Sequence, residues 1–262
     1  MRNFLKAVTG MTLAAVILTT ALLFTPGRSV AGEKLTVAGA ADLTFAFNEI
    51  AKDFEKETGV KVVLSLGSTG MLTRQIEHGA PFDIFFAANS KYIDELEKGG
   101  YVIPDTVALY AVGRVVLAVN RASGVKATTL KDLLDPKIKK VAIANPAHAP
   151  YGVAAMEALK SAGLWEALKG KLVYGENVRQ TLQFIQTGNA ETGIVALSVA
   201  DLPEISYTLI DAKLHNPIRQ AAAVVKTTGD ELRAREFIKY VLGPKGRPIM
   251  HKYGFVLPEE DR

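Results

Sequence analysis

Short apolar runs alternate with longer amphipathic segments along most of this chain. Residues 34–38, 115–120 and 192–196 are short segments rich in apolar residues, as expected of strands. After Leu43 the apolar residues Phe47, Ile50 and Phe54 recur at helical spacing, and Gly59 ends the segment. Strand-like and helix-like segments that alternate in this way are typical of α/β proteins with helices on both faces of a sheet.

The same pattern predicts the order of the elements and a division into two lobes. Strands are expected at 34–38, 60–66, 83–87, 115–120, 141–144, 192–196 and 221–225, and helices at 43–58, 71–78, 90–98, 129–134, 151–162, 177–187 and 231–242. A new strand begins near 111–114, after a loop that contains Pro104, and the chain crosses back near 216–221. We therefore expect one lobe from 32–112 plus 221–262, a second from 113–220, and a ligand cleft between them.

Three turns with the same build lie between strand-like and helix-like segments. They are Ala40-Ala41-Asp42-Leu43-Thr44, Gly67-Ser68-Thr69-Gly70 and Pro150-Tyr151-Gly152. The first amides of a helix have no intrahelical acceptors and lie at the positive end of the helix dipole, so they can bind an anion. Each turn alone is equally well explained as an ordinary helix cap. Three converging turns would form a receptor for an anion.

The first 31 residues are predicted to be a cleavable signal peptide. Arg2 and Lys6 precede an apolar stretch at 7–24, and Ser29-Val30-Ala31 forms a small-x-small cleavage signal. An uncleaved membrane anchor is the alternative, because the stretch approaches the shortest length that spans a bilayer. The chain has no cysteine, so neither a lipidated thiol nor a disulfide is expected.

Charge and motif content exclude several classes of function. The predicted leader carries three of the 31 basic residues and no acidic one, which leaves 28 basic and 27 acidic residues and no basic face for nucleic acid. The four histidines lack the short spacing of a cation site. No Gly-x-Ser-x-Gly elbow surrounds Ser68, and 67–70 lacks the Gly-Lys-Ser/Thr ending of a P-loop.

Several motifs together resemble the periplasmic molybdate-binding proteins of ABC importers. They are Ala38-Gly39-Ala40-Ala41-Asp42-Leu43-Thr44, the segment 67–83 with Arg74-Gln75-Ile76-Glu77-His78-Gly79-Ala80-Pro81, the segment 145–152, Gly175-Glu176-Asn177-Val178, the segment 188–198 and Tyr253-Gly254-Phe255. The resemblance implies a two-lobed, type II periplasmic-binding fold with mixed, mostly parallel sheets. It also implies that neutral hydrogen-bond donors recognise a tetrahedral dianion, without a metal cation, cofactor or catalysis.

Carried over by position, the resemblance places the ligand contacts at Asp42, Thr69, Tyr151, Val178 and Ala196. Ser68, beside Thr69, offers a hydroxyl and an amide to the same ligand. Two of these positions depart from the pattern of the family. Many relatives carry a serine or asparagine in place of Asp42, and some carry a tyrosine in place of Ala196, whose side chain has no donor. Tyr151 is expected to compensate for that missing hydroxyl.

Asp42 is unusual in such a site because an ionised carboxylate only accepts hydrogen bonds and repels a dianion. We expect it to cap its own helix, near the amides of Thr44 or Phe45, so that backbone N–H groups face the ligand. In the alternative, Asp42 accepts a proton from a protonated oxyanion, which would favour a different ligand.

These observations predict an exported, monomeric receptor that captures molybdate, and tungstate as well, and delivers it to a membrane permease. A receptor for sulfate, chromate or phosphate is the first alternative function. An enzyme built on the same fold is a second and weaker alternative. A carboxylate receptor would need an arginine in the cleft, and no predicted site position is arginine.

Overall fold

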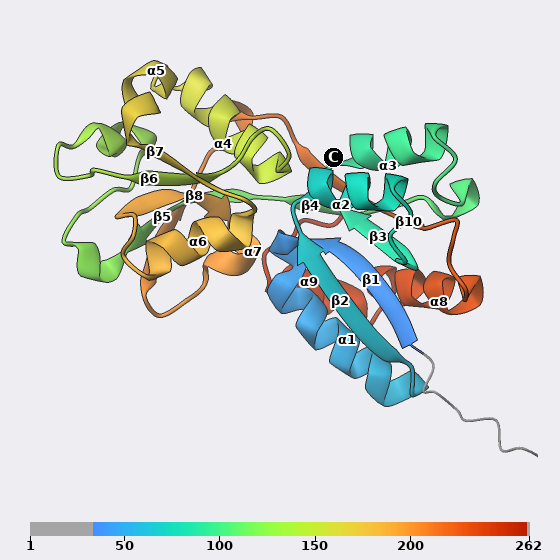
Figure 1. Cartoon of the computed structure of the whole chain (residues 1–262). Coiled ribbons are helices and arrows are strands. Elements are labelled where there is room, and N and C mark those ends of the chain that lie inside the picture. Colours follow the sequence, from blue (N-terminus) through green and yellow to red (C-terminus); the bar gives the residue numbers. More distant parts are fainter. Residues whose placement is uncertain (1–33, 261–262) are drawn as a thin grey trace, which may run out of the picture. The chain divides into compact units, whose positions relative to one another are not determined.

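The computed structural model describes residues 34–260, and within them the strands form two five-stranded sheets (Figure 1). The first sheet has the order β2-β1-β3-β10-β4. Its strands are β1 (Lys34–Ala40), β2 (Lys61–Gly67), β3 (Ile84–Ala87), β4 (Ala108–Gly113) and β10 (Ile218–Val224). β2 and β3 flank β1 in parallel, whereas β10 runs antiparallel to β3 and β4.

The second sheet repeats this arrangement with the order β7-β6-β8-β5-β9. Its strands are β5 (Val115–Asn120), β6 (Val141–Ala144), β7 (Leu172–Gly175), β8 (Thr192–Ala196) and β9 (Ile205–Leu209). β7 and β8 flank β6 in parallel, and β5 runs antiparallel to both β8 and β9. Each sheet therefore contains as many antiparallel as parallel pairings, because one strand in each sheet runs against the others.

Most of the helices lie between successive strands of the chain, and α8 and α9 follow the last strand, β10. They are α1 (Thr44–Thr58), α2 (Thr69–Glu77), α3 (Ser90–Lys98), α4 (Pro150–Ser161), α5 (Trp165–Leu168), α6 (Val178–Gln186), α7 (Leu197–Ala200), α8 (Glu231–Leu242) and α9 (Gly246–Lys252). The 3-10 segments are η1 (Ala41–Leu43), η2 (Pro104–Thr106), η3 (Arg121–Ser123), η4 (Leu130–Leu134), η5 (Lys169–Lys171) and η6 (Ala212–Leu214).

The core is built on both faces of each sheet. In the first sheet, Phe47 of α1 and Phe237 of α8 pack edge-to-face with Phe86 of β3 and with each other, and Phe54 of α1 packs edge-to-face with Phe237. α2 and α3 contribute a separate cluster. A larger cluster joins the second sheet to α4 and α6, and it also includes Ala40 and Ala41 at the end of β1. Apolar packing thus continues from one sheet to the other at the start of η1.

The predicted two-lobed α/β fold is confirmed, and most of the predicted elements lie within a few residues of their observed bounds. β4, β7, β9, α5, α7 and α9 were not predicted, and 129–134 forms a 3-10 segment rather than an α-helix. Only Arg114 separates β4 of the first sheet from β5 of the second. The exact lobe limits stay a prediction. The predicted signal peptide lies outside the described residues.

No helix within residues 34–260 combines the length and the apolar character needed to cross a membrane.

Candidate functional site

Four helical segments begin at one small cavity. Its lining includes the first residues of η1, α2, α4 and α6, which are Ala41, Thr69, Pro150 and Val178. The full lining consists of Ala40, Ala41, Asp42, Gly67, Ser68, Thr69, Ala88, Ala149, Pro150, Tyr151, Asn177 and Val178. The cavity has a volume of about 10 Å³, which is the space of about one water molecule. The three predicted turns therefore converge, and the start of α6 joins them.

Backbone amides at these helix starts remain available to a ligand. In the first turn of α4, Pro150 has no N–H group, and the amides of Gly152 and Val153 both donate to the carbonyl oxygen of Ala149. The amide of Tyr151 is therefore the one that remains unused in this turn. In α6, Oδ1 of Asn177 accepts hydrogen bonds from the amides of Arg179 and Gln180, the second and third residues of the helix. The amide of Val178, the first residue, remains available to a ligand. Together with the Thr69 amide of α2, these donors come from three helix N-termini, which is a typical anion-binding arrangement.

Two hydroxyl groups add side-chain donors to the amides. Thr69 Oγ1 accepts a hydrogen bond from the amide of Ala88 at 3.1 Å, which leaves its hydroxyl proton to point elsewhere. Ser68 Oγ lies 2.9 Å from Nδ1 of His148. When His148 carries a proton on Nδ1 it donates to Ser68, and the hydroxyl proton of Ser68 is then free for a ligand.

Asp42 lies in a buried network that joins the two sheets. Its Oδ2 accepts hydrogen bonds from Tyr151 Oη at 2.8 Å and from Gln220 Nε2 at 2.7 Å. Gln220 Nε2 also lies 3.0 Å from Tyr151 Oη, and its Oε1 accepts from Tyr110 Oη at 2.6 Å. The backbone carbonyl of Asp42 accepts from Ser198 Oγ of α7. Because Tyr151 and Ser198 lie on helices of the second sheet, these bonds connect the sheets at the cavity.

Burial dominates the electrostatics of this network. It raises the pKa of Asp42 to about 6, although the hydrogen bonds from Gln220 and Tyr151 act in the opposite direction. Burial, followed by the negative charge of Asp42, also raises the pKa of the Tyr110 and Tyr151 phenols well above the ordinary range. Both phenols are therefore permanent donors at neutral pH.

Five of the predicted site residues line the cavity, and one does not. Asp42, Ser68, Thr69, Tyr151 and Val178 are all part of the lining. The buried Ala196 at the end of β8 does not contribute to it. The single phenol proton of Tyr151 is donated to Asp42, so only its amide remains for a ligand.

The predicted helix-capping role of Asp42 is wrong. No side chain caps α1, and the carboxylate accepts from Gln220 and Tyr151 instead of the amides of Thr44 or Phe45. The physical reason is that η1 is inserted between β1 and α1, so that Leu43 rather than Asp42 is the N-cap residue of α1. The Asp42 carboxylate instead meets donors from Tyr151 and Gln220, which lie 109 and 178 residues away in the sequence.

Four polar residues at the site were not identified from the sequence: Asn177, His148, Ser198 and Gln220. Asn177 had a readable signal, because asparagine is a preferred N-cap and is the first residue of the predicted helix 177–187. His148 and Ser198 contact the site across the two sheets, Gln220 reaches Asp42 from β10 of the first sheet, and none of the three has a local signature.

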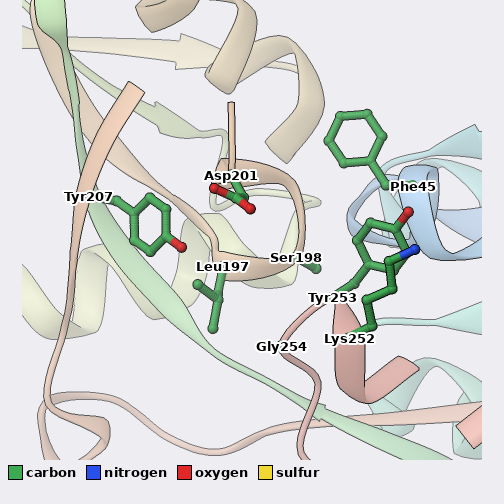
Figure 2. A pocket seen from close by; sticks show the side chains of 8 residues that line it. All are labelled: Phe45, Leu197, Ser198, Asp201, Tyr207, Lys252, Tyr253 and Gly254. Atoms are coloured by element: carbon green, nitrogen blue, oxygen red, sulfur yellow. The ribbon is translucent and has the colours of Figure 1, made fainter. Parts of the chain in front are cut away.

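A larger groove of about 290 Å³ is lined in part by Ser198, which also donates to the Asp42 carbonyl, and is a weaker candidate (Figure 2). Tyr207 and Asp201 line one side, and Phe45, Lys252 and Tyr253 line the other. Lys252 is already paired with Glu49 at 2.7 Å, and Asp201 would repel an anion. The groove has none of the converging amides of the small cavity.

Comparisons with known proteins agree with this geometry. Residues 35–256 match the family described as bacterial extracellular solute-binding protein. The molybdate-binding protein ModA of Azotobacter vinelandii is 40% identical over 86% of this chain and 90% of its own length, and that of Rhodobacter capsulatus is 34% identical over 94% and 95%. The solved periplasmic molybdate-binding protein of Azotobacter vinelandii superposes with a TM-score of 0.80 at 33% identity, covering 86% of this chain and 99% of that one. This chain therefore belongs to the bacterial extracellular solute-binding proteins, in the family of these molybdate-binding relatives.

Proposed function

We propose that this chain is an exported receptor that captures molybdate at the cavity between its two sheets and delivers it to an ABC permease. The observation that carries the proposal is the convergence of η1 and the N-termini of α2, α4 and α6 on one cavity. The relatives named as molybdate-binding proteins, which align along almost their whole length, support the same ligand.

The donors in this site suit a doubly charged tetrahedral oxyanion. The amides of Thr69, Tyr151 and Val178 and the hydroxyls of Ser68 and Thr69 supply fixed donors that replace those of water. Hydrogen bonds to a charged group contribute roughly 1.5–3 kcal/mol each. Five such bonds together contribute roughly 7.5–15 kcal/mol before the cost of association and ordering is subtracted.

Binding requires movement of the two lobes. The cavity of about 10 Å³ is smaller than an ion of five heavy atoms. The oxyanion therefore enters when the lobes separate, and the lobes close again around it. Closure brings Ser68 and Thr69 against Tyr151 and Val178 and creates the surface that a permease recognises.

The other properties of the proposed receptor follow from its task as a carrier. It is exported by cleavage after residue 31, functions as a monomer, and needs no cofactor, metal cation or catalytic group. Molybdate and tungstate have the same charge and shape, so the site is expected to bind both.

Calorimetric titration of residues 32–262, freed of ligand, tests the proposal. Molybdate or tungstate is expected to bind tightly with one-to-one stoichiometry, and sulfate, chromate and phosphate far more weakly. Tight binding of phosphate or sulfate in preference to both group-six oxyanions would contradict the proposal and identify a receptor for another oxyanion.

Replacement of Thr69 by valine tests the donor set. The variant keeps the shape of the side chain but loses the hydroxyl proton, so molybdate affinity is expected to fall at least about tenfold, the lower range for a hydrogen bond to a charged group. Calorimetry measures the loss. Thr69→Ser keeps the hydroxyl and should bind close to the parent, and parental affinity in Thr69→Val would show that this hydroxyl does not contact the ion.

A further inference from the structure

Asp42 is the one charged side chain in the lining of the cavity, considering the part of the chain that the structure describes. A dianion that entered beside an ionised Asp42 would place like charges together in a buried space. Building on the function proposed above, we propose that Asp42 takes up one proton whenever the oxyanion binds, so that the receptor captures the dianion together with H⁺.

The hydrogen bonds of Asp42 indicate where this proton is held. Asp42 and Gln220 are 0% exposed, Tyr110 is 2% and Tyr151 is 3% exposed. Both donors to the carboxylate, Tyr151 and Gln220, reach Oδ2. Oδ1 is buried and has no hydrogen-bond partner among residues 34–260. The proton therefore forms its bond with Oδ1.

Within residues 34–260, only burial and hydrogen bonds act on Asp42, and no neighbouring cation relieves the repulsion. The titratable groups that reach it are the phenols of Tyr151 and, through Gln220, of Tyr110. α6 also packs against η1, but the guanidinium of its Arg179 lies over the ring of Phe45, 5.2 Å from the centroid. α7 contributes the neutral hydroxyl of Ser198.

β2 also packs against η1 and leads into Gly67 and Ser68, and Ser68 is bonded to His148 on the far side of the cavity. α1 follows η1 directly, and its first charged residue, Glu49, is paired with Lys252. None of these elements supplies a positive charge to the carboxylate. Proton uptake at Asp42 is thus the available way to remove the like charge.

The chemical balance of this step is simple. One proton passes from the protonated buffer, through solvent, to Asp42 Oδ1. The bond between the buffer and that proton breaks, one O–H bond forms at Oδ1, and no bond of the oxyanion breaks. The carboxyl group becomes neutral, keeps Oδ2 as the acceptor for Tyr151 and Gln220, and turns Oδ1 from an acceptor into a donor. Protonation therefore converts the unfavourable wall of the cavity into one that suits a dianion.

The electrostatics of the protein without ligand favour this coupling. Burial already brings the pKa of Asp42 to about 6, so the group is ionised at pH 8 but close to the range where it gains a proton. A dianion nearby raises this pKa further, because it disfavours the charged form.

Titration of the purified protein with sodium molybdate at pH 8, in Tris and in HEPES, measures the proton directly. These buffers release different heats on ionisation, so the observed heats are expected to differ by the amount for one proton per bound ion. The association constant is expected to fall about tenfold for each pH unit between 7 and 9. Equal heats and a constant affinity would overturn the inference while leaving the proposed function intact.

Asp42→Asn is the matched variant, because its amide mimics a protonated carboxyl. It is expected to show no proton uptake and a constant affinity between pH 7 and 9. Uptake of a full proton by this variant would overturn the assignment to Asp42 and implicate another group, such as His148. Absence of any molybdate binding by the parent protein is a separate result, and it would contradict the proposed function itself.

Discussion

Replacement of Gly70 by alanine is expected to weaken molybdate binding more than about a hundredfold while the protein remains folded. A Cβ atom at Gly70 would lie 2.9 Å from the carbonyl oxygen and 3.1 Å from the Cα atom of His148. The Gly70 amide donates to that same carbonyl at 2.9 Å, which joins the start of α2 to the loop before α4. The added methyl group therefore keeps the two lobes apart at the cavity.

The size of the effect follows from the donors that closure brings together. If the lobes do not close, at least two hydrogen bonds to the ion are lost, and their combined contribution of about 3 kcal/mol or more corresponds to at least a hundredfold in affinity. Folding is expected to persist because alanine is a better helix former than glycine, and Gly70 is the second residue of α2. Calorimetry with molybdate and the thermal midpoint of the ligand-free protein measure the two effects separately.

Gly229→Ala provides the control for the Gly70 variant. A Cβ atom at Gly229 would meet nothing within 4 Å, so this variant should bind and unfold like the parent. Parental affinity in Gly70→Ala would mean that the contact between Gly70 and His148 is not part of the ligand-bound state.

The fold was predictable wherever one segment carried its own signal. α1 has a clear apolar stripe and ends at Gly59, which adopts the left-handed conformation with φ of 74°, and strands such as β5 are continuous apolar runs. β4 was missed because only Arg114 separates it from β5, so the two strands read as one apolar run, and β9 was missed because Ser206 and Thr208 alternate with its apolar residues. Burial on one face alone gives a weaker signal in a short strand.

The candidate site was predictable only in its local parts. The Gly67–Gly70 turn and the start of α4 were recognisable because helix starts have characteristic residues. The network around Asp42 was not, because its partner Gln220 belongs to β10 and becomes a neighbour only when β10 pairs with β3, the strand beside β1. Gly113 gives a similar example. A Cβ atom there would lie 2.1 Å from Tyr151 Oη, so the fold requires glycine at this position, and the residues next to it in the sequence give no sign of that requirement.

Replacement of Asp42 by asparagine is expected to increase the free energy of unfolding by about 3 kcal/mol at pH 8 in the absence of ligand. The pKa of this buried carboxyl is about 6 in the folded protein and 3.8 in the reference state, and each unit of difference corresponds to about 1.4 kcal/mol. The asparagine side chain keeps an oxygen to accept from Tyr151 and Gln220 but carries no charge. The variant therefore avoids the cost of burying an ionised group.

The sign of the pH dependence follows from the raised pKa. The folded protein holds the Asp42 proton more tightly than the unfolded chain does, so this contribution to stability is fully present below about pH 3.8 and is lost as the pH rises through about 6. The advantage of Asp42→Asn should therefore be largest at pH 7 and above and fall below about 1 kcal/mol at pH 4. Urea denaturation of both proteins at pH 8 and pH 4 measures the difference.

Two further variants distinguish charge from packing in this experiment. Asp94→Asn removes a carboxylate from the exposed face of α3 and should change stability by less than about 0.5 kcal/mol at either pH. Asp42→Ala removes the acceptor as well as the charge and leaves Tyr151 and Gln220 without their partner, so it should be less stable than Asp42→Asn. If Asp42→Asn were no more stable than the parent at pH 8, the carboxyl would not be a destabilised buried charge, and its proton coupling to the ligand would lose its physical basis.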